Sequence, residues 1–434
     1  MRHNPLLYKA SPRSLWIFTE SWRAFAGGIA FTLWMVYQAK IAGLDALQLV
    51  AVGTALEIGV LLFEVPTGIV ADVYSRRVSV MIGAVVVGAG FIIMGTMPSF
   101  WPIAFGSFIW GVGHTFFSGA GQAWLSDEIG EDKAGDAFLA SAQWQQLAAA
   151  AGIVISVVIG WRDLAAPVWI CGFLYLFLAG VLLCVMPEDG YRPTPIQRRN
   201  TFSHMAQTFR AGLNTIRARP LMVTLILITL VFAAQSESYD RLWTKHLLDN
   251  FDLPVFTDLP LLGAASPDQS EVLWFGIIRM VSLLIGAVVL QRVRRRIDSE
   301  DPESVARGLW LVIVGLVALF LLFANAGAVW ISLLCLFLIG PLRSIVGPLH
   351  LSLINRGIDP RVRATVLSMD GQTDAVGQLV GGIPLGWVGN VFGVRAAITG
   401  GALLLIPGIW LGGRAVRLAR GLSVEQAPPA DEIA

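Results

Sequence analysis

The chain has 434 residues, of which 55% are hydrophobic and 14% are charged, and its formal net charge is +1. Soluble domains carry about 25% charged residues, so this composition excludes an ordinary soluble protein. A mean hydropathy of +0.68 agrees with that conclusion. We expect membrane lipids as partners and no nucleic acid.

Apolar stretches of about 20 residues, the length that crosses a bilayer as a helix, recur along the whole chain. These stretches lack the period-two alternation of barrel strands, which favours helices. We predict twelve spanning helices, at residues 14–39, 46–71, 78–97, 101–126, 137–160, 165–186, 220–246, 271–291, 305–324, 327–354, 363–389 and 394–413.

Lys and Arg side chains are unevenly distributed between the predicted connections. Most of the 31 lie in the termini and the even-numbered connections, whereas the long connection 247–270 carries Asp249, Asp252, Asp258 and Asp268 without a cation. Because cytoplasmic loops are enriched in Lys and Arg, we predict that both termini are cytoplasmic. That orientation requires an even number of spans.

A polar interval at 187–219 divides the predicted helices into six and six. Within it, TFSHMAQTFRAGLNTIRA places apolar side chains at helical spacing, which predicts an amphipathic helix on the membrane surface. The halves contain similar segments, GIVADVYSRR at 68–77 and GAVVLQRVRR at 286–295, which favours duplication and the layout of a secondary transporter. The predicted parts are an N-terminal bundle at 1–186, a cytoplasmic linker at 187–219, a C-terminal bundle at 220–420 and a disordered tail at 421–434.

The decapeptide GIVADVYSRR resembles the cytoplasmic loop signature of the major facilitator superfamily, Gly-x-x-x-Asp-(Arg/Lys)-x-Gly-(Arg/Lys)-(Arg/Lys). Four positions match, namely Gly68, Asp72, Arg76 and Arg77, whereas Ser75 stands where the signature has glycine. The resemblance implies an all-α membrane protein whose twelve transmembrane helices form two pseudo-symmetric six-helix bundles.

The resemblance also implies a cytoplasmic gate around this loop. Glycine allows close approach of two helices, and Asp72 is placed to accept from the positive N-terminus of the eleventh helix, near 361–364. The two arginines are placed to pair with acids at the end of the fourth helix, although the charge bias alone would also explain them. The predicted gate consists of Gly68, Asp72, Arg76, Arg77, Asp127 and Glu128.

Two of the predicted spans, the second and the eleventh, each carry two carboxylates, and ionisable side chains inside spans are costly and indicate function. Glu57 and Glu64 are two turns apart on the second helix, and Asp370 and Asp374 are one turn apart on the eleventh. The resemblance places these two helices side by side between the halves. We predict that the four are proton-coupling sites, with Glu57 and Asp374 first; the alternative is that each is a salt-bridged packing residue.

A substrate cavity is predicted from polar and aromatic side chains on helices expected to border it. They are His114, Gln122, Trp124, Gln143, Trp144, Gln146, Arg279, Arg343 and His350. Rings mixed with amides suit amphipathic molecules better than sugars. Glu237, Asp240 and Arg241 bunch toward the outer end of the seventh helix, as an outer gate or an interfacial network.

The segments FEVPTGIVADVYSRR, SGAGQAWLSDEIGE and NRGIDPRVRATVLSMDGQTDAVGQLVGG resemble the bacterial proton-coupled drug-efflux branch of the superfamily. This resemblance implies export of small amphipathic molecules against protons across the bacterial cytoplasmic (inner) membrane by alternating access. Proton symport and flipping of a lipid-like solute are the alternatives. We expect a monomer without cofactor or metal, and the absence of HExxH, GxSxG and P-loop motifs disfavours an enzyme or an ATP-driven pump.

Overall fold

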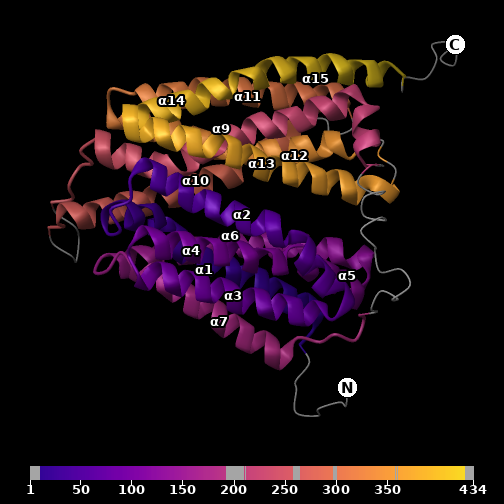
Figure 1. The fold of residues 1–434 in the computed structure, drawn as a ribbon, viewed down its shortest axis with the longest axis horizontal. Helices are drawn as coiled ribbons and strands as arrows, with labels where there is room; N and C mark the ends of the chain where they lie inside the picture. The colour runs from indigo at the N-terminus through magenta and orange to yellow at the C-terminus, as the bar shows by residue number, and fades with distance from the viewer. Residues whose placement is uncertain are drawn as a thin grey trace. The chain divides into compact units, whose positions relative to one another are not determined.

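The computed structural model describes residues 10–191, 210, 212–257, 264–296, 301–356, 358 and 360–425. In these residues the regular secondary structure is helical, without a strand (Figure 1). The end of the predicted amphipathic helix, residues 212–217, is helical, whereas its beginning and the tail from 426 lie outside the described residues.

The chain packs as two units. The first comprises Met1–Arg199 and Asp252–Met280, and the second Asn200–Phe251 and Val281–Ala434. Helix α10 (Pro267–Arg296) therefore contributes its first part to the first unit. The predicted division of the chain at 187–219 stays a prediction.

The first unit is built from long helices that lie side by side in Figure 1. Helix α1 packs against α6 and α7, α3 packs against α4 and α7, and α2 packs against α4. The helices are α1 (Pro12–Lys40), α2 (Ala46–Val73), α3 (Arg76–Thr96), α4 (Phe100–Phe117), α5 (Ala120–Ile129), α6 (Glu131–Gly160) and α7 (Ala166–Val185).

The second unit repeats this order of pairing. Helix α9 packs against α13 and α15, and α11 packs against α12 and α15. In each half, the first helix thus pairs with the fifth and the third pairs with the fourth and sixth, as a duplicated bundle predicts. Besides the end of α10, the helices are α9 (Pro220–Asn250), α11 (Pro302–Asn325), α12 (Val329–Ile354), α13 (Pro360–Phe392), α14 (Val394–Leu404) and α15 (Ile406–Glu425).

Two predicted helices are interrupted. The span 101–126 breaks at Ser118 and Gly119, where Gly119 has a φ of +72°, a left-handed conformation that favours glycine. The prediction of one continuous helix there was wrong, because a glycine in an apolar run gives no sign of its backbone angle. Leu405 similarly separates α14 from α15 within the predicted span 394–413.

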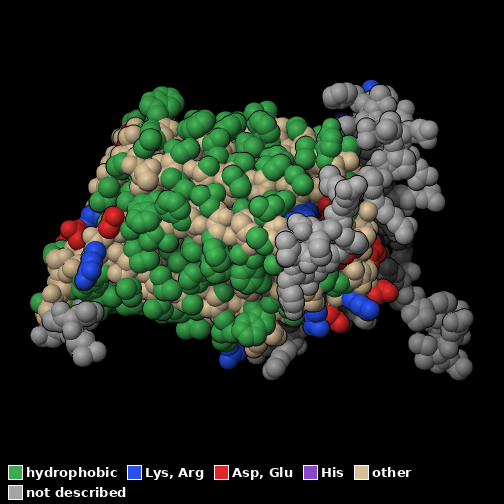
Figure 2. All heavy atoms as spheres, turned by 90° about the horizontal axis from the view of Figure 1, so that it is seen from below, with side chains coloured by type: hydrophobic (Ala, Val, Ile, Leu, Met, Phe, Trp, Pro, Cys, Tyr) green, Lys and Arg blue, Asp and Glu red, His purple; other side chains and the backbone are tan. Residues whose placement is uncertain are grey.

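Ten stretches of the described helices are long and apolar enough to cross a membrane: α2, α3, α6, α7, α9, α10, α11, α12, α13 and the joined α14–α15. The other two predicted spans correspond to α1, which carries Glu20 and Arg23, and to the interrupted α4–α5. On the face drawn in Figure 2, hydrophobic side chains cover most of the described surface, and charged side chains gather near two of its edges. The predicted all-α membrane fold is confirmed, and twelve spans are consistent with it.

Small residues allow a close approach of α1 and α6 in the first unit. A Cβ added at Gly28 of α1 would lie 3.1 Å from the Cα of Gly152 in α6, and a Cβ added at Gly152 would lie 3.0 Å from the Cα of Gly28. Such contacts between small residues are typical of membrane helices that pack tightly.

In the second unit, glycines likewise allow close approach of the corresponding helices, α9 and α13. A Cβ added at Gly377 of α13 would lie 2.7 Å from the carbonyl oxygen of Leu230 in α9, and one added at Gly381 would collide with Ala234. The tight packing expected of these two glycines is therefore made against α9.

Replacing Gly152 with Ala is expected to destabilise the first unit by about 1–3 kcal/mol, because the added methyl group overpacks the contact with α1. Thermal unfolding of the detergent-solubilised protein measures the effect as a lower Tm. The matched control is Gly135→Ala on the same helix, since a Cβ there meets no described atom within 4 Å. Equal melting temperatures for the two variants would contradict the prediction.

Candidate functional site

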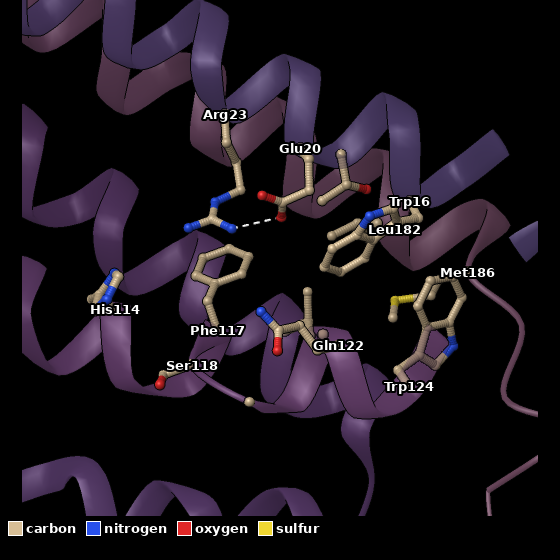
Figure 3. Close-up of a pocket in the computed structure, with 14 residues that line it drawn as sticks. Trp16, Glu20, Arg23, His114, Phe117, Ser118, Gln122, Trp124, Leu182 and Met186 are labelled. Carbon is tan, nitrogen blue, oxygen red and sulfur yellow. Dashed lines mark hydrogen bonds and ion pairs between the residues drawn. The ribbon is translucent and has the colours of Figure 1, made fainter. Parts of the chain in front are cut away.

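A cavity of about 270 Å³ lies within the first unit, among α1, α4, α5 and α7 (Figure 3). Its polar lining includes Thr19, Glu20, Arg23, His114, Ser118 and Gln122, and its aromatic lining is Trp16, Phe117 and Trp124. The break at Ser118 starts a new helix there, and Gln122 and Trp124 of that helix face this space. The predicted span 101–126 was continuous across this break.

The charged centre of the first cavity is an ion pair on α1. Glu20 and Arg23 are three residues apart and so share a helix face, with Arg23 Nη1 at 2.7 Å from Glu20 Oε1. The Arg23 guanidinium carbon also lies 4.5 Å from the centroid of the Phe117 ring, a cation–π distance. Figure 3 shows both side chains pointing into the space that Gln122 enters from the opposite wall.

Three predicted cavity residues, His114, Gln122 and Trp124, line this space. Gln143, Trp144 and Gln146 do not line it, because they lie on an exposed face of α6. Helical spacing fixes which residues share a face but does not say which way that face points.

Arg279 is held by the first unit as well. Its Nη2 donates to the carbonyl oxygen of Phe31 at 2.9 Å, so it joins α10 to α1. The same two helices are joined at the end of α1, where Lys40 Nζ lies 2.6 Å from Asp268 and 2.7 Å from Glu271.

A second cavity, of about 340 Å³, lies within the second unit among α9, α12 and α13. Its polar lining is Thr229, Arg343, His350, Asp370 and Asp374, and Phe232 adds an aromatic ring. Arg343 and His350 were predicted as substrate-cavity residues, and Asp370 and Asp374 were predicted as proton-coupling sites. Thr229 and Phe232 were missed, because an isolated Thr or Phe in an apolar helix gives no signal in one sequence.

Asp370 lies in a three-member hydrogen-bonded cluster within this cavity. The Thr229 hydroxyl donates to Asp370 Oδ1 at 2.7 Å, and His350 Nε2 lies 3.2 Å from both carboxylate oxygens and 3.1 Å from Thr229 Oγ1. The side chains of His350 and Asp370 are 11% and 19% exposed. A carboxylate and an imidazole so placed can hold one proton between them.

Asp374 lies one turn further along α13 and accepts a hydrogen bond from Gln378 Nε2 at 2.7 Å. Arg343, on the facing helix α12, pairs with Asp240 through both guanidinium nitrogens, with Nη2 at 2.7 Å from Oδ2. Arg343 is therefore neutralised by α9, and the two carboxylates of α13 carry the remaining formal charge of the cavity.

The outer network predicted on α9 consisted of Glu237, Asp240 and Arg241, and the Arg343–Asp240 pair separates Asp240 from the other two. Arg241 Nε lies 3.1 Å from Glu237 Oε2 on the same helix, whereas Asp240 turns to Arg343. The sequence could not reveal the second pair, whose members are 103 residues apart.

The other two predicted proton sites lie on α2, in the first unit. Glu64 accepts from the Ser118 hydroxyl at 3.1 Å, and Glu57 also has an interaction partner. The convergence of these acids with Asp370 and Asp374 on one seam would involve both units and stays a prediction.

The loop between α2 and α3 is held by acidic side chains of the first unit. Arg76 Nη1 lies 2.5 Å from Asp127 Oδ2, whereas the Arg77 guanidinium donates to the carbonyl oxygen of Leu183 at 2.6 Å. Glu128 accepts instead from the backbone N–H of Gly190 at 2.7 Å. Of the two arginines, only Arg76 therefore meets one of the expected acids.

Ser75, which replaces the glycine of the loop signature, has two functions in this structure. It caps α3 by accepting from the backbone N–H of Val78 at 3.0 Å, and its hydroxyl lies 2.9 and 2.7 Å from the two carboxylate oxygens of Glu188. The Arg77 backbone N–H donates to the same carboxylate at 3.0 Å. Glu188 was not among the predicted residues, because no motif marks it.

Asp72 contributes its backbone to this region, because its carbonyl oxygen accepts from the Tyr191 hydroxyl at 2.9 Å. Burial and the neighbouring Glu188 carboxylate raise the pKa of Tyr191, so the hydroxyl remains a donor. A Cβ added at Gly68 would meet no described atom within 4 Å, and the predicted role of Gly68 in the cytoplasmic gate stays a prediction. Helix α2 makes its close contact at Gly59, where a Cβ would lie 3.2 Å from the backbone nitrogen of Val112.

Replacing Ser75 with Ala is expected to cost about 0.5–2 kcal/mol, the usual loss for a helix cap, and to free Glu188. Thermal unfolding measures the change as a lower Tm. Ser99→Ala is the matched control, because Ser99 occupies the same position before α4 without a side-chain cap bond. A Tm unchanged by Ser75→Ala, or lowered equally by both changes, would contradict the prediction.

Comparison with known proteins identifies the class. The family model of the Major Facilitator Superfamily matches residues 23–373, so the chain belongs to this superfamily of transporters. It is 21% identical over 393 residues to the uncharacterized MFS-type transporter YxaM of Bacillus subtilis (strain 168), covering 89% of this chain and 91% of YxaM.

Solved structures agree on the fold. A bacterial homologue of the human lysosomal transporter Spinster matches with a TM-score of 0.70 and 13% identity, over 97% of this chain and 100% of that one. The nucleoside transporter NupG matches with a TM-score of 0.67 and 15% identity, over 96% of this chain and 100% of that one.

Across the described part of this chain, no group of three or more His, Cys, Asp or Glu side chains could hold a metal ion.

Proposed function

We propose that this chain is a secondary active transporter of the cytoplasmic membrane that exports small amphipathic molecules in exchange for protons. The single observation that carries the proposal is the second-unit cavity, in which Asp370, His350 and Asp374 line one space between spanning helices. Ionisable side chains at such depth are costly and mark ion and proton pathways. We place both termini in the cytoplasm, from the bias of Lys and Arg, and expect a monomer.

The proposed exchange follows from charge neutralisation. When the cavity faces the acidic outer side, Asp374 and the Asp370–His350 pair take up protons and lose net negative charge. The protein then reorients with less desolvation cost, because neutral carboxyls pass through the low-dielectric state more easily than carboxylates. Release of the protons on the inner side restores the negative charge. The deprotonated protein then binds the solute on the inner side, and its return to the outward-facing state releases the solute outside and completes the exchange.

Glu57 and Glu64 of α2 are proposed to assist, with Glu64 tied to the helix break by Ser118. The loop centred on Asp72 and Arg76 is proposed as the cytoplasmic gate. Its supports are the Arg76–Asp127 ion pair and the Glu188 contacts, together with the resemblance to the drug-efflux branch in the same segment.

Proteoliposomes containing the purified protein and an internal pH-sensitive dye test the proposal. Addition of a transported amphipathic solute should move protons in wild type, whereas Asp374→Asn and Glu57→Gln should reduce the signal to that of empty liposomes. Asp249→Asn is the control, because Asp249 pairs with Lys245 near the end of α9 and its side chain is 43% exposed.

The direction of the proton signal separates the alternatives. Counterflow of protons and solute supports antiport, and movement in the same direction supports symport in its place. Proton flux that persists in both Asp374→Asn and Glu57→Gln would overturn the assignment of the proton sites.

A further inference from the structure

The first-unit cavity contains features that the proton-coupling sites of the second unit do not explain. We propose that it binds a small zwitterion with an apolar body, whose carboxylate contacts Arg23 and whose ammonium contacts Glu20. This inference rests on the proposed function, because it names the class of solute that the same transporter carries.

The fixed charges on this cavity are one of each sign. Glu20 and Arg23 are the Asp, Glu, Lys or Arg side chains in its lining, and His114 is its other titratable group. A ligand with a single charge would leave one member of the pair uncompensated in a low-dielectric space, which is strongly unfavourable. A zwitterion gives each member a new partner of opposite sign, so no charge is left alone.

The existing ion pair leaves binding capacity on both partners. The contact uses one oxygen of Glu20 and one terminal nitrogen of Arg23, although a guanidinium has five N–H donors. Tyr175 also interacts with Arg23. Arg23 Nε is buried without a hydrogen-bond partner in the described structure. The Arg23 side chain is nevertheless 24% exposed, so a carboxylate can reach the guanidinium from the cavity and form a charge-assisted hydrogen bond with it.

The remaining walls suit an apolar body of limited size. The indole N–H of Trp16 donates to Ser141 Oγ at 3.3 Å and that of Trp124 donates to the Pro187 carbonyl at 2.7 Å. The polar edges of both rings are thus occupied, and Figure 3 shows the two rings near Leu182 and Met186 at one end of the space. A volume of about 270 Å³ falls just below the ~300–1,000 Å³ of drug-sized pockets, so the expected ligand has the size of an amino acid.

Equilibrium binding to the purified full chain in nanodiscs, without any gradient, tests the inference. Four probes share one phenyl body and differ in charge: L-phenylalanine, 3-phenylpropanoate, 2-phenylethylamine and 2-phenylethanol. Calorimetry should give L-phenylalanine the lowest Kd by about tenfold or more, because each other probe lacks at least one charge-assisted hydrogen bond. Equal affinity for L-phenylalanine and a singly charged probe, or no binding of any probe, would overturn the proposal.

Substitutions in the ion pair should change the ranking in opposite directions. Glu20→Gln should favour 3-phenylpropanoate, Arg23→Gln should favour 2-phenylethylamine, and the double exchange Glu20→Arg with Arg23→Glu should restore preference for L-phenylalanine. Arg13→Gln and Glu131→Gln make the same chemical changes at exposed positions of the first unit and serve as controls. A ranking that is the same in wild type and both single variants would overturn the proposal.

The binding test and the proton-flux test can fail independently of each other, so they separate the two proposals. If the charge ranking is absent while solute-driven proton flux persists, the zwitterion assignment is wrong and the transporter proposal stands. If the ranking is present without proton flux in proteoliposomes, the site is supported and proton coupling is wrong. If a single variant does not purify as a monodisperse protein, the wild-type ranking and the double exchange still decide the outcome.

Discussion

Replacing Asp370 with Asn is expected to abolish transport driven by a pH gradient while downhill exchange of labelled solute continues. The amide oxygen of Asn can still accept from Thr229, whose hydroxyl lies 2.7 Å from Asp370 Oδ1, so the local packing is kept. An amide does not take up a proton at physiological pH, and the step that neutralises the cavity is therefore lost. Uphill accumulation in proteoliposomes and counterflow at equal pH measure the two activities separately.

Two further variants sharpen this result. His350→Gln should shift the pH dependence of uphill transport, because the imidazole 3.2 Å from Asp370 no longer shares the proton, and it should leave downhill exchange in place. Asp136→Asn, an exposed acid on α6, is the control and should behave as wild type. Uphill transport by Asp370→Asn at the wild-type rate would exclude Asp370 from proton coupling.

Replacing Arg343 with Met is expected to cause the largest loss of stability in the second unit. The change leaves the Asp240 carboxylate without its bidentate partner between spanning helices. Removal of one member of a fully buried pair costs about 3–5 kcal/mol, and the loss here should be smaller than that because the Asp240 side chain is 41% exposed. Thermal unfolding in detergent measures the decrease in Tm.

The double change Arg343→Met with Asp240→Leu provides the decisive comparison. It removes both charges together, so it should recover most of the lost Tm without recovering transport. The control is Lys245→Met, which breaks an exposed pair on the same helix and should cost less than about 1 kcal/mol. A double variant as unstable as the single one would show that the unpaired charge is not the cause.

The spanning helices were predictable because their length and apolar content follow directly from the bilayer. The GxxxG contact of Gly377 and Gly381 was predictable for a related reason, since small residues at that spacing mark a packed face. The conformation of Gly119 was not, because an unmarked glycine is compatible with a continuous helix. The break at Ser118 and Gly119 gives Gln122 and Trp124 a helix of their own, α5.

Some residues that line the two cavities could be predicted from the sequence, but their pairings could not. Charges in apolar helices identified Asp370, Asp374 and Arg343, because each such charge is expensive. The hydrogen bonds of Asp370 with His350 and Thr229 join helices far apart in the chain, and one sequence does not record such contacts. Likewise, the three-residue spacing of Glu20 and Arg23 places both on one face of α1, whereas the cavity around them depends on α4, α5 and α7.

The Glu188, Gly190 and Tyr191 contacts affect the tether between the two halves. These bonds fasten the chain beyond the end of α7 at Val185, so the tether cannot begin before residue 192. The six residues 186–191 would span at most about 20 Å if extended. Because these bonds fasten the six residues to the first unit, they cannot lengthen the chain segment that joins the two halves.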